Sequence, residues 1–411
     1  MNKLPPTEAL KVGIQFKQDV MPVGRLAIHD IRIYFEYDVD FLANGIEISP
    51  FKLPLSSGLQ ELSLHPFEGL PGVFYDSLPD GWGRLLFDRY VRSLQMLPEE
   101  FSPLDRLAHI GLSGLGALVY EPDLNISLED HTTISLDEFA IQSKTILQGG
   151  ASDVLKELIQ LNGSSAGARP KALIHFNPGN NLISAGNTLP SYDFEYWLVK
   201  FANNSDGIDA GAIEYVYALM ANEAGIDMMP VHLFETTSCA GYFATKRFDR
   251  LGNKRLHKHT ASGLLHSDFR IPSLDYLDLL KITMNLTKDI REVEKMYRLA
   301  VFNVMSHNRD DHGKNFSFLM DDTGEWKLAP AYDLTFSSGP GGHHSTMVLG
   351  EGQTPTIDNL TQLGKEAGLK RNQLTEICDQ TLHAISKWEK LANNYGVTTT
   401  NISLVKSRLM L

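Results

Sequence analysis

The feature that most constrains this chain is the octet "NRDDHGKN", residues 308–315, which places charged and amide side chains between two apolar segments. It follows an apolar helical pattern and leads directly into the apolar run "FSFLM" at 316–320. Because apolar segments are buried, these polar groups must lie where two buried elements join. Either the octet is an ordinary solvated loop, or its charges are held there to bind something more highly charged.

The residues after the octet predict a β-hairpin that folds back on it. "FSFL" is a candidate strand, "DDTG" at 321–324 a turn, and "WKLA" at 326–329 the returning strand. The hairpin would return Asp333 to a place beside Asp310 and Asn315. Phosphoryl transfer needs such a set: one carboxylate to deprotonate the acceptor hydroxyl, with an amide and a second carboxylate to hold Mg²⁺. The spacing Asp310-x₄-Asn315 is also that of a protein-kinase catalytic loop.

A rival interpretation takes His307, Asp310, Asp311 and His312 as a transition-metal site of a hydrolase. It leaves Asn315 without a role and gives no reason for the lysines upstream, so phosphoryl transfer is favoured.

The pattern along the chain predicts an α+β, bilobal fold. At 411 residues two or three subdomains are expected. Short alternating runs between residues 12 and 37 predict antiparallel strands, and a helical pattern follows within 76–94. Three strands are expected at 171–176, 196–201 and 241–248, with a helix starting near Ile213, and the sequence from Ser273 onward is largely helical. We therefore expect three segments: an extra N-terminal β-rich subdomain at 1–125, a mixed β-rich N-terminal lobe at 126–250, and an all-helical C-terminal lobe at 251–411.

Composition restricts the partners and the compartment. The net charge of −13 opposes unaided binding to nucleic acid, so any DNA contact would need a basic partner. No stretch approaches the roughly 18 apolar residues of a membrane span, and the beginning lacks the apolar core of a signal peptide. With two cysteines in no metal-ligand spacing, a cytoplasmic protein without membrane contact is expected.

Two upstream features suit a nucleotide. "NGSSAGARPKALI" at 162–174 has small residues that let backbone N–H groups approach phosphates, although a plain glycine turn is at least as common. Lys200 ends the apolar run "YWLVK", where its ammonium could neutralise phosphates, although a lysine reaching solvent is the commoner case. Glu214 could pair with Lys200, with Glu223 as the alternative. "TKRFDR" at 245–250 would join the lobes, with Phe248 packing on an adenine ring.

Together these segments resemble the HipA family of bacterial serine/threonine kinases, the toxins of type II toxin–antitoxin pairs. "FEGLPGVFYDSLPDGWGR" and "LDRLAHIGLSGLGAL" are similar to its amino-terminal region, and "SSAGARPKAL" to its glycine-rich loop. "RFDR" resembles its hinge, "NRDDHGKNFSF" with "AYDLT" its catalytic core, and "GGHHSTMVLGEGQTPT" the segment that follows. The resemblance covers nearly the whole chain and implies a protein-kinase-like fold.

The resemblance also implies roles for single residues. Asp310 would be the catalytic base, Asn315 and Asp333 would bind Mg²⁺, and Ser164, with Ser165 as the alternative, would be autophosphorylated. The implied ATP-binding residues are Ala166, Gly167, Ala168, Arg169, Pro170, Lys171, Lys200, Lys246, Arg247, Phe248, His312 and Tyr332. Lys246 departs from the pattern, since an acidic residue is expected there, which bears on the hinge contact alone.

The function expected from this resemblance is an ATP- and Mg²⁺-dependent protein kinase that inhibits growth by phosphorylating a protein such as an aminoacyl-tRNA synthetase. Its expected partner is a helix-turn-helix antitoxin of the HipB type, which would link it indirectly to operator DNA. The alternatives are a small-molecule phosphotransferase using the same core, and a nucleotide-binding co-repressor that acts together with the antitoxin.

Overall fold

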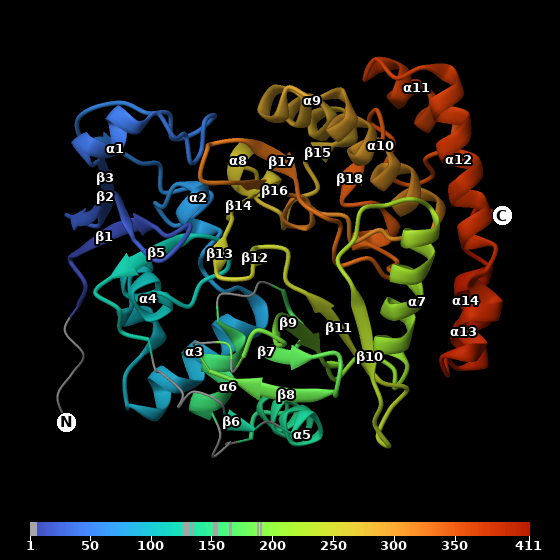
Figure 1. The fold of residues 1–411 in the computed structure, drawn as a ribbon, viewed down its shortest axis with the longest axis horizontal. Coiled ribbons are helices and arrows are strands. Elements are labelled where there is room, and N and C mark those ends of the chain that lie inside the picture. The colour runs from blue at the N-terminus through green and yellow to red at the C-terminus, as the bar shows by residue number, and fades with distance from the viewer. Residues whose placement is uncertain are drawn as a thin grey trace.

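The computed structural model describes residues 6–125, 132–133, 135–150, 155–163, 167–186, 189 and 191–411. Its first layer is a five-stranded antiparallel sheet in the order β4-β3-β2-β1-β5 (Figure 1). Alternate residues of β3 are buried, as expected for a strand with one face on a core. The strands are β1 (Ala9–Ile14), β2 (Met21–His29), β3 (Arg32–Tyr37), β4 (Gln60–Glu61) and β5 (Leu118–Glu121).

The helices of this part of the chain are α1 (Val39–Asn44), α2 (Gly72–Tyr75), α3 (Gly81–Ser93), the 3₁₀ turn η1 (Pro98–Glu100) and α4 (Pro103–Ile110). Helix α4 begins with a capping box, in which Ser102 and Asp105 bond each other's backbone N–H groups. The predicted strands at 12–37 and the helix within 76–94 are thus confirmed.

A second antiparallel sheet follows, in the order β10-β11-β9-β7-β8-β6 (Figure 1). Its strands are β6 (Thr132–Thr133), β7 (Lys171–Asn177), β8 (Leu182–Ala185), β9 (Glu195–Lys200), β10 (Val231–Phe234) and β11 (Tyr242–Lys246). The helices of this region are α5 (Leu136–Leu147), α6 (Leu155–Asn162) and α7 (Ala210–Glu223). The strands and the helix expected between residues 171 and 248 are confirmed.

The remainder is mostly helical, and it also contains short strands that the expected all-helical lobe did not include. The hairpin β12 (Arg250–Leu251) and β13 (Lys254–Arg255) leads into the sheet β14-β16-β17, formed by His257–Thr260, Ser317–Met320 and Trp326–Leu328. The predicted hairpin is therefore confirmed, with Phe318 opposite Leu328. A parallel pair, β15 (Leu274–Asp275) and β18 (Thr346–Met347), lies nearby.

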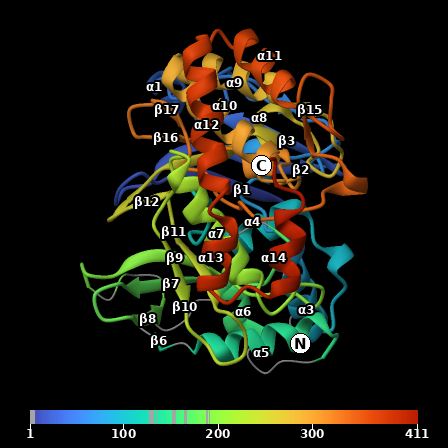
Figure 2. The same cartoon turned by 90° about the vertical axis from the view of Figure 1, so that its right-hand side faces the viewer.

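The helices and 3₁₀ turns of this part complete the chain: α8 (Ala261–Leu265), α9 (Tyr276–Thr287), α10 (Ile290–Met305), η2 (Gly313–Asn315), η3 (Pro340–Gly342), α11 (Ile357–Glu366), α12 (Arg371–Ile385), α13 (Trp388–Asn394) and α14 (Thr399–Lys406). Figure 2 shows α12, α13 and α14 on the outer side of the molecule, with α7 beside them. No helix among the described residues is long and apolar enough to cross a bilayer.

Two hydrophobic cores hold these layers together. One joins the first sheet to the C-terminal helices, and the other lies against the second sheet. Trp82 and Leu86 of α3 belong to the second core, although α3 lies early in the chain. The segment boundary near residue 125 stays a prediction, but α3 clearly packs on the elements that follow it.

Candidate active site

Lys200 is the last residue of β9, and its ammonium lies between two carboxylates. The Nζ atom donates to Glu214 in the N-terminal half of α7, and to Oδ1 of Asp333 at 2.5 Å. Glu214 is buried, whereas the alternative partner Glu223 is exposed and pairs with Lys387 at 2.6 Å. Glu214 is therefore the partner of Lys200, as first expected.

Asp333 lies just beyond the hairpin, in left-handed backbone geometry with φ +59°. Such geometry is uncommon for a residue other than glycine and concentrates at functional positions. Burial alone would raise the pKa of Asp333, but the ammonium groups of Lys200 and Lys171 lower it well below the usual carboxyl range. Asp333 is thus held ionised beside two cations.

Tyr332 fixes the position of Asp333 against the octet. Its hydroxyl donates to the carbonyl of Lys314 at 2.5 Å and lies 2.5 Å from the Ser317 hydroxyl. The hairpin therefore brings its far end back to its near end, as predicted from the sequence.

Asp310 and Asn315 lie together in the octet. The Nδ2 group of Asn315 donates to the carbonyl of Asp310 at 2.7 Å, which leaves the Asn315 Oδ1 atom to act as an acceptor or ligand. Asp310 is an exposed residue, yet the protein atoms around its carboxyl group raise its pKa. The nearby His312 lowers that pKa by a smaller amount. The negative charge of Asp333 raises the pKa of Asp310 further.

A residue to which the kinase interpretation gave no role holds the octet in place. Asp311 is buried and accepts from the Tyr276 hydroxyl at 2.7 Å, from His344 Nδ1 at 2.9 Å and from the Ser345 N–H at 2.8 Å. The segment "GGHHSTMVLGEGQTPT" supplies two of these donors, so its proximity to the octet could have been suspected but its register could not.

The rival metal site is not supported. Among the described residues no group of three or more His, Cys, Asp or Glu side chains is placed to hold a metal ion. Asp311 is committed to four hydrogen-bond donors, and His307 stacks on Phe336 with ring centroids 5.5 Å apart.

The glycine-rich loop is described from Gly167 onward, whereas Ser164, Ser165 and Ala166 lie outside the described residues. Ala168 follows Gly167, and the Pro170 carbonyl accepts from the Phe201 N–H at 2.8 Å. The Arg169 guanidinium bonds Asp206 at 2.9 Å and lies 3.8 Å from Glu214. The loop thus brings one more cation close to the Lys200 cluster.

Lys171 begins β7 directly opposite Lys200 of β9. It is buried, and burial together with the positive charge of Lys200 lowers its pKa to about 8. Two lysines on neighbouring strands therefore lie close to one carboxylate, Asp333, which is a suitable arrangement for phosphate oxygens.

The predicted hinge differs in detail from expectation. The N–H groups of Lys246 and Arg247 donate to the carbonyls of Pro230 and Tyr196, at 2.9 and 2.8 Å, so neither is directed at an open site. Their side chains bond Glu195 and Asp249. Phe248 packs against Tyr332, with ring centroids 5.4 Å apart. Its contact with an adenine ring stays a prediction.

His312 lies on the other side of the octet, 5.3 Å from the Phe269 ring. Its Nδ1 atom is buried and has no hydrogen-bond partner among the described residues. A buried nitrogen without a hydrogen bond costs free energy, so the His312 Nδ1 atom is available to bond a ligand in this region.

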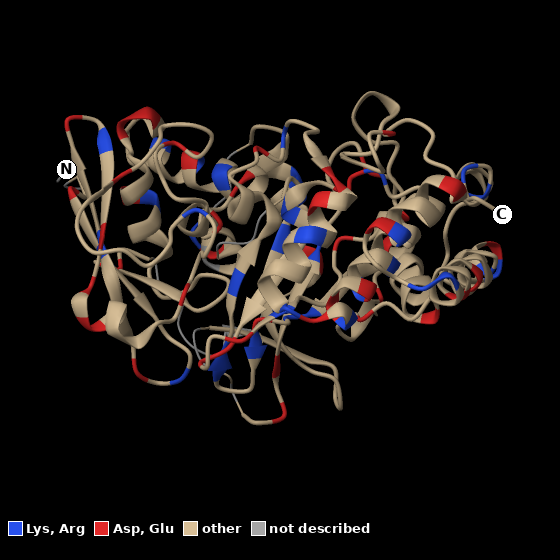
Figure 3. Cartoon of the chain, turned by 90° about the horizontal axis from the view of Figure 1, so that it is seen from above, with Lys and Arg blue, Asp and Glu red and all other residues tan. Residues whose placement is uncertain are grey.

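These residues fit a nucleotide with Mg²⁺. Mg²⁺ is usually held by one or two carboxylates together with phosphates and water, and Asp333 with the Asn315 Oδ1 atom meets that requirement. Figure 3 shows acidic residues scattered along the molecule and a group of basic residues near its middle. That local charge favours a polyanionic ligand despite the net charge of −13.

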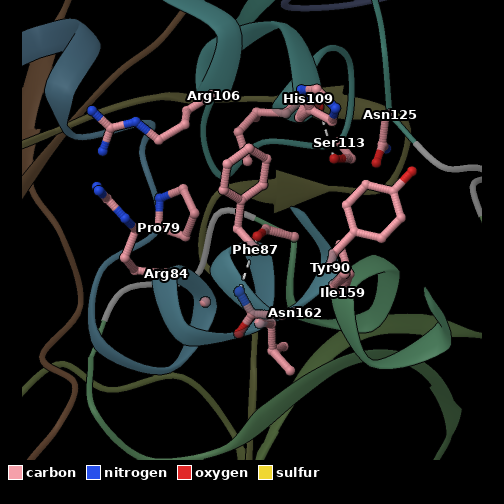
Figure 4. Close-up of a pocket in the computed structure, with 14 residues that line it drawn as sticks. Pro79, Arg84, Phe87, Tyr90, Arg106, His109, Ser113, Asn125, Ile159 and Asn162 are labelled. Atoms are coloured by element: carbon pink, nitrogen blue, oxygen red, sulfur yellow. Dashed lines mark hydrogen bonds between the residues drawn. The ribbon is translucent and has the colours of Figure 1, made fainter. Parts of the chain in front are cut away.

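A separate pocket lies between α3, α4 and α6 (Figure 4). Its walls include Arg84, Phe87, Tyr90 and His109, and it also reaches Gly163, at the beginning of the glycine-rich loop. Neither Asp310 nor Asp333 lines it, so its position does not define the site.

Comparisons with known proteins identify the family of this chain. The model described as HipA-like C-terminal domain matches residues 163–388, and the one described as HipA N-terminal domain matches residues 16–121. A putative kinase of Sinorhizobium fredii, Y4mE, is 26% identical over 383 residues, covering 82% of this chain and 83% of that protein.

Among solved structures, the chain is similar to one from the Shewanella oneidensis complex of HipA, HipB and operator DNA. The TM-score is 0.66 at 16% identity, over 97% of this chain and 94% of that one. The proinflammatory kinase CtkA of Helicobacter pylori aligns over 53% of this chain and 86% of its own, with a TM-score of 0.38 and 14% identity. The similarity to the Shewanella chain confirms the predicted α+β fold of the HipA type.

Proposed function

Because this chain belongs to the HipA family, we propose that it is an ATP- and Mg²⁺-dependent serine/threonine protein kinase and the toxin of a type II toxin–antitoxin pair. The observation that carries the proposal is the position of Lys200 between Glu214 and Asp333, with Asp310 and Asn315 in the adjoining octet. Packing alone does not require carboxylates and cations to gather in this way.

Each residue then has a chemical role. Asn315 and Asp333 would hold Mg²⁺, while Lys200 and Lys171 would neutralise and orient phosphate oxygens. Magnesium-bound ATP supplies the phosphoryl group when it is present. Asp310 would orient the acceptor hydroxyl and take its proton, for which a carboxylate with a raised pKa is better suited than an ordinary one. Phe248 and Tyr332 would lie against the base.

The partners follow from charge and family. An acidic chain binds DNA poorly alone, so a helix-turn-helix antitoxin of the HipB type would supply the operator contacts. The Shewanella structure, which contains HipA, HipB and operator DNA, supports this assignment. The protein substrate would be an essential translation factor such as an aminoacyl-tRNA synthetase.

Autophosphorylation would regulate the enzyme at Ser164, with Ser165 as the alternative. A phosphoserine carries close to two negative charges at neutral pH. In a loop that approaches nucleotide phosphates, that charge would repel them, so modification would switch the kinase off.

The test measures transfer of γ-phosphate from labelled ATP, with Mg²⁺, to the protein itself and to purified aminoacyl-tRNA synthetases. We expect Asp310→Asn to lower the rate on the order of 10²–10⁴-fold, because the acceptor proton loses its base. Lys200→Met should weaken ATP binding. Asp322→Asn is the control, since Asp322 lies exposed in the turn of the same hairpin and pairs only with Lys17 among the described residues.

The result that contradicts the proposal is wild-type protein that labels no protein, or labels it at the rate of Asp310→Asn. Label on a small hydroxylated molecule instead would identify a small-molecule phosphotransferase. Operator affinity that rises with this chain, yet is indifferent to Asp310→Asn, would identify a co-repressor.

A further inference from the structure

The segment "SLPDGWGR", residues 77–84, contains an aspartate whose side chain leaves its own helix. Asp80 precedes α3 at the position where an aspartate normally accepts a bond from the first backbone N–H groups. Here no side-chain cap is formed. The carboxylate instead accepts from the Gly167 N–H through Oδ1 and from Lys314 Nζ through Oδ2, the latter at 2.7 Å.

The segment around Asp80 bonds both backbone groups of Gly167 in the glycine-rich loop. The Gly167 N–H is bound by Asp80, and the Gly167 carbonyl accepts from the Trp82 N–H at 3.0 Å. Gly81 lies between, at φ +45°, and a Cβ there would lie 2.7 Å from the Gly167 carbonyl oxygen. Such a close backbone approach is possible only because Gly81 has no side chain.

The other end of the contact reaches the octet. Lys314 directly precedes Asn315, and its side chain is 5% exposed. Its ammonium lies 4.5 Å from the centre of the Phe269 ring and 5.1 Å from that of Tyr75. Its carbonyl accepts from Tyr332, the neighbour of Asp333. A displacement of Lys314 would therefore move both Asn315 and Asp333.

Burial makes this link strong. The Asp80 side chain is 12% exposed, and although burial would raise its pKa, the charge of Lys314 and the bond from Gly167 lower it. A buried charge that loses its partner is strongly destabilised, so neither group is expected to leave the other readily. The amino-terminal unit, residues 1–125, thus supplies one carboxylate that joins the glycine-rich loop to the octet.

We propose that Asp80 is a positioning residue that couples the glycine-rich loop to the catalytic octet, through Gly167 and Lys314. The proposal rests on the proposed kinase function, and it gives the amino-terminal unit a direct part in assembling the site. It explains why aspartate, glycine and tryptophan stand together at residues 80–82.

The experiment compares wild type with Asp80→Asn, with Lys314→Met and with the double variant that carries both changes. Asp88→Asn is the control. Asp88 lies in the same helix and pairs with Arg84 near the surface, without contacting either loop. Hydrogen–deuterium exchange of peptides covering residues 167–174 and 308–316 is measured first, and the ATP KM and kcat are measured separately.

We expect Asp80→Asn to speed exchange in both peptides at least fivefold, while exchange within α3 stays at the wild-type rate. The ATP KM should rise about tenfold, because a loosened loop loses its hold on phosphate. The double variant should be no worse than the poorer single variant, since both changes break one link. Exchange and ATP KM equal to those of Asp88→Asn would overturn the proposal.

Hydrogen–deuterium exchange does not require catalytic turnover, so it tests the role of Asp80 even if the wild-type protein transfers no phosphate. A lack of phosphate transfer would count against the kinase assignment alone. Should Asp80→Asn fail to fold, Lys314→Met must show the faster exchange by itself. Wild-type rates in that variant would equally overturn the proposal.

Discussion

At the level of single residues, the chemistry depends on how a few charges share a small volume. Lys200 and Lys171 lie on adjacent strands, and both act on Asp333. Lys200 has two carboxylate partners, which raise its pKa against the effect of burial, whereas burial lowers the pKa of Lys171 to about 8. The two lysines therefore differ. Lys200 stays protonated at every physiological pH, whereas Lys171 is the lysine whose protonation an anionic ligand can increase.

This difference predicts a pH-dependent affinity for ATP. Phosphates bound beside Lys171 would favour its charged form and raise its pKa, so binding takes up a proton when the pH exceeds about 8. From pH 7 to pH 9 the affinity should fall about tenfold, as follows from a group with that pKa. The measurement is calorimetric titration with a non-hydrolysable ATP analogue and Mg²⁺.

The variant Lys171→Met should bind more weakly at pH 7 and lose most of this slope. Lys144→Met, which alters an exposed lysine of α5, serves as the control and should keep the slope. An unchanged slope in Lys171→Met would show that another group titrates.

At the level of elements, the sequence pattern predicted those helices and strands whose formation depends on neighbouring residues. The hairpin was predictable because alternating apolar residues flank a turn rich in aspartate and glycine, and β16 and β17 pair as expected. Strand β14 was not, since its sequence "HKHT" looks polar. His257 and His259 are nevertheless buried, where they bond the Ile48 carbonyl and Asp76.

The same limit applies to the site. Asp310, Asn315 and Asp333 are close in sequence, so spacing and one hairpin sufficed to group them. Asp80 is 87 residues from Gly167 and 234 from Lys314, and no local pattern carries that information. The nucleotide contact of Arg247 stays a prediction, and the sequence did not indicate that its guanidinium bonds Asp249.

One element can be tested directly: the octet is held to α9 by the Tyr276 hydroxyl. This hydroxyl donates to Asp311 and accepts from Asn303 Nδ2 at 3.0 Å. Tyr276→Phe leaves both buried groups short of a partner, so the free energy of unfolding should fall by about 1–3 kcal/mol. Denaturant unfolding measures it. Tyr192→Phe is the control, as Tyr192 is 93% exposed and its loss should change stability by less than about 0.5 kcal/mol. Equal stability of the two variants would show that the octet is anchored elsewhere.

For the molecule as a whole, the amino-terminal unit is a structural partner of the C-terminal lobe. One core continues from the first sheet into the C-terminal helices, and α2 lies so close to α8 that a Cβ on Gly72 would be 2.2 Å from the Gly263 carbonyl oxygen. Asp76, four residues before Asp80, crosses the same boundary. It accepts from His259 Nδ1 at 2.7 Å and from the Thr260 N–H and hydroxyl. The two aspartates of this segment thus bind the unit to the rest of the chain.

The bond network of Asp76 predicts how overall stability responds to acid. Burial would raise the pKa of this carboxyl, but the hydrogen bond and charge of His259 lower it to about 2, against about 4 in an unfolded chain. Ionised Asp76 therefore stabilises the fold above about pH 4, on the order of 2 kcal/mol, and that contribution is lost as the pH falls towards 2. Asp76→Asn should lower the free energy of unfolding at pH 7 by this amount, and the gap to wild type should shrink to about half by pH 3. Tryptophan fluorescence during denaturant unfolding at pH 7, 5 and 3 measures the gap, with Asp88→Asn as the control that shows none. A gap that stays constant over this range would mean that Asp76 acts by shape and hydrogen bonding alone, and not through its charge.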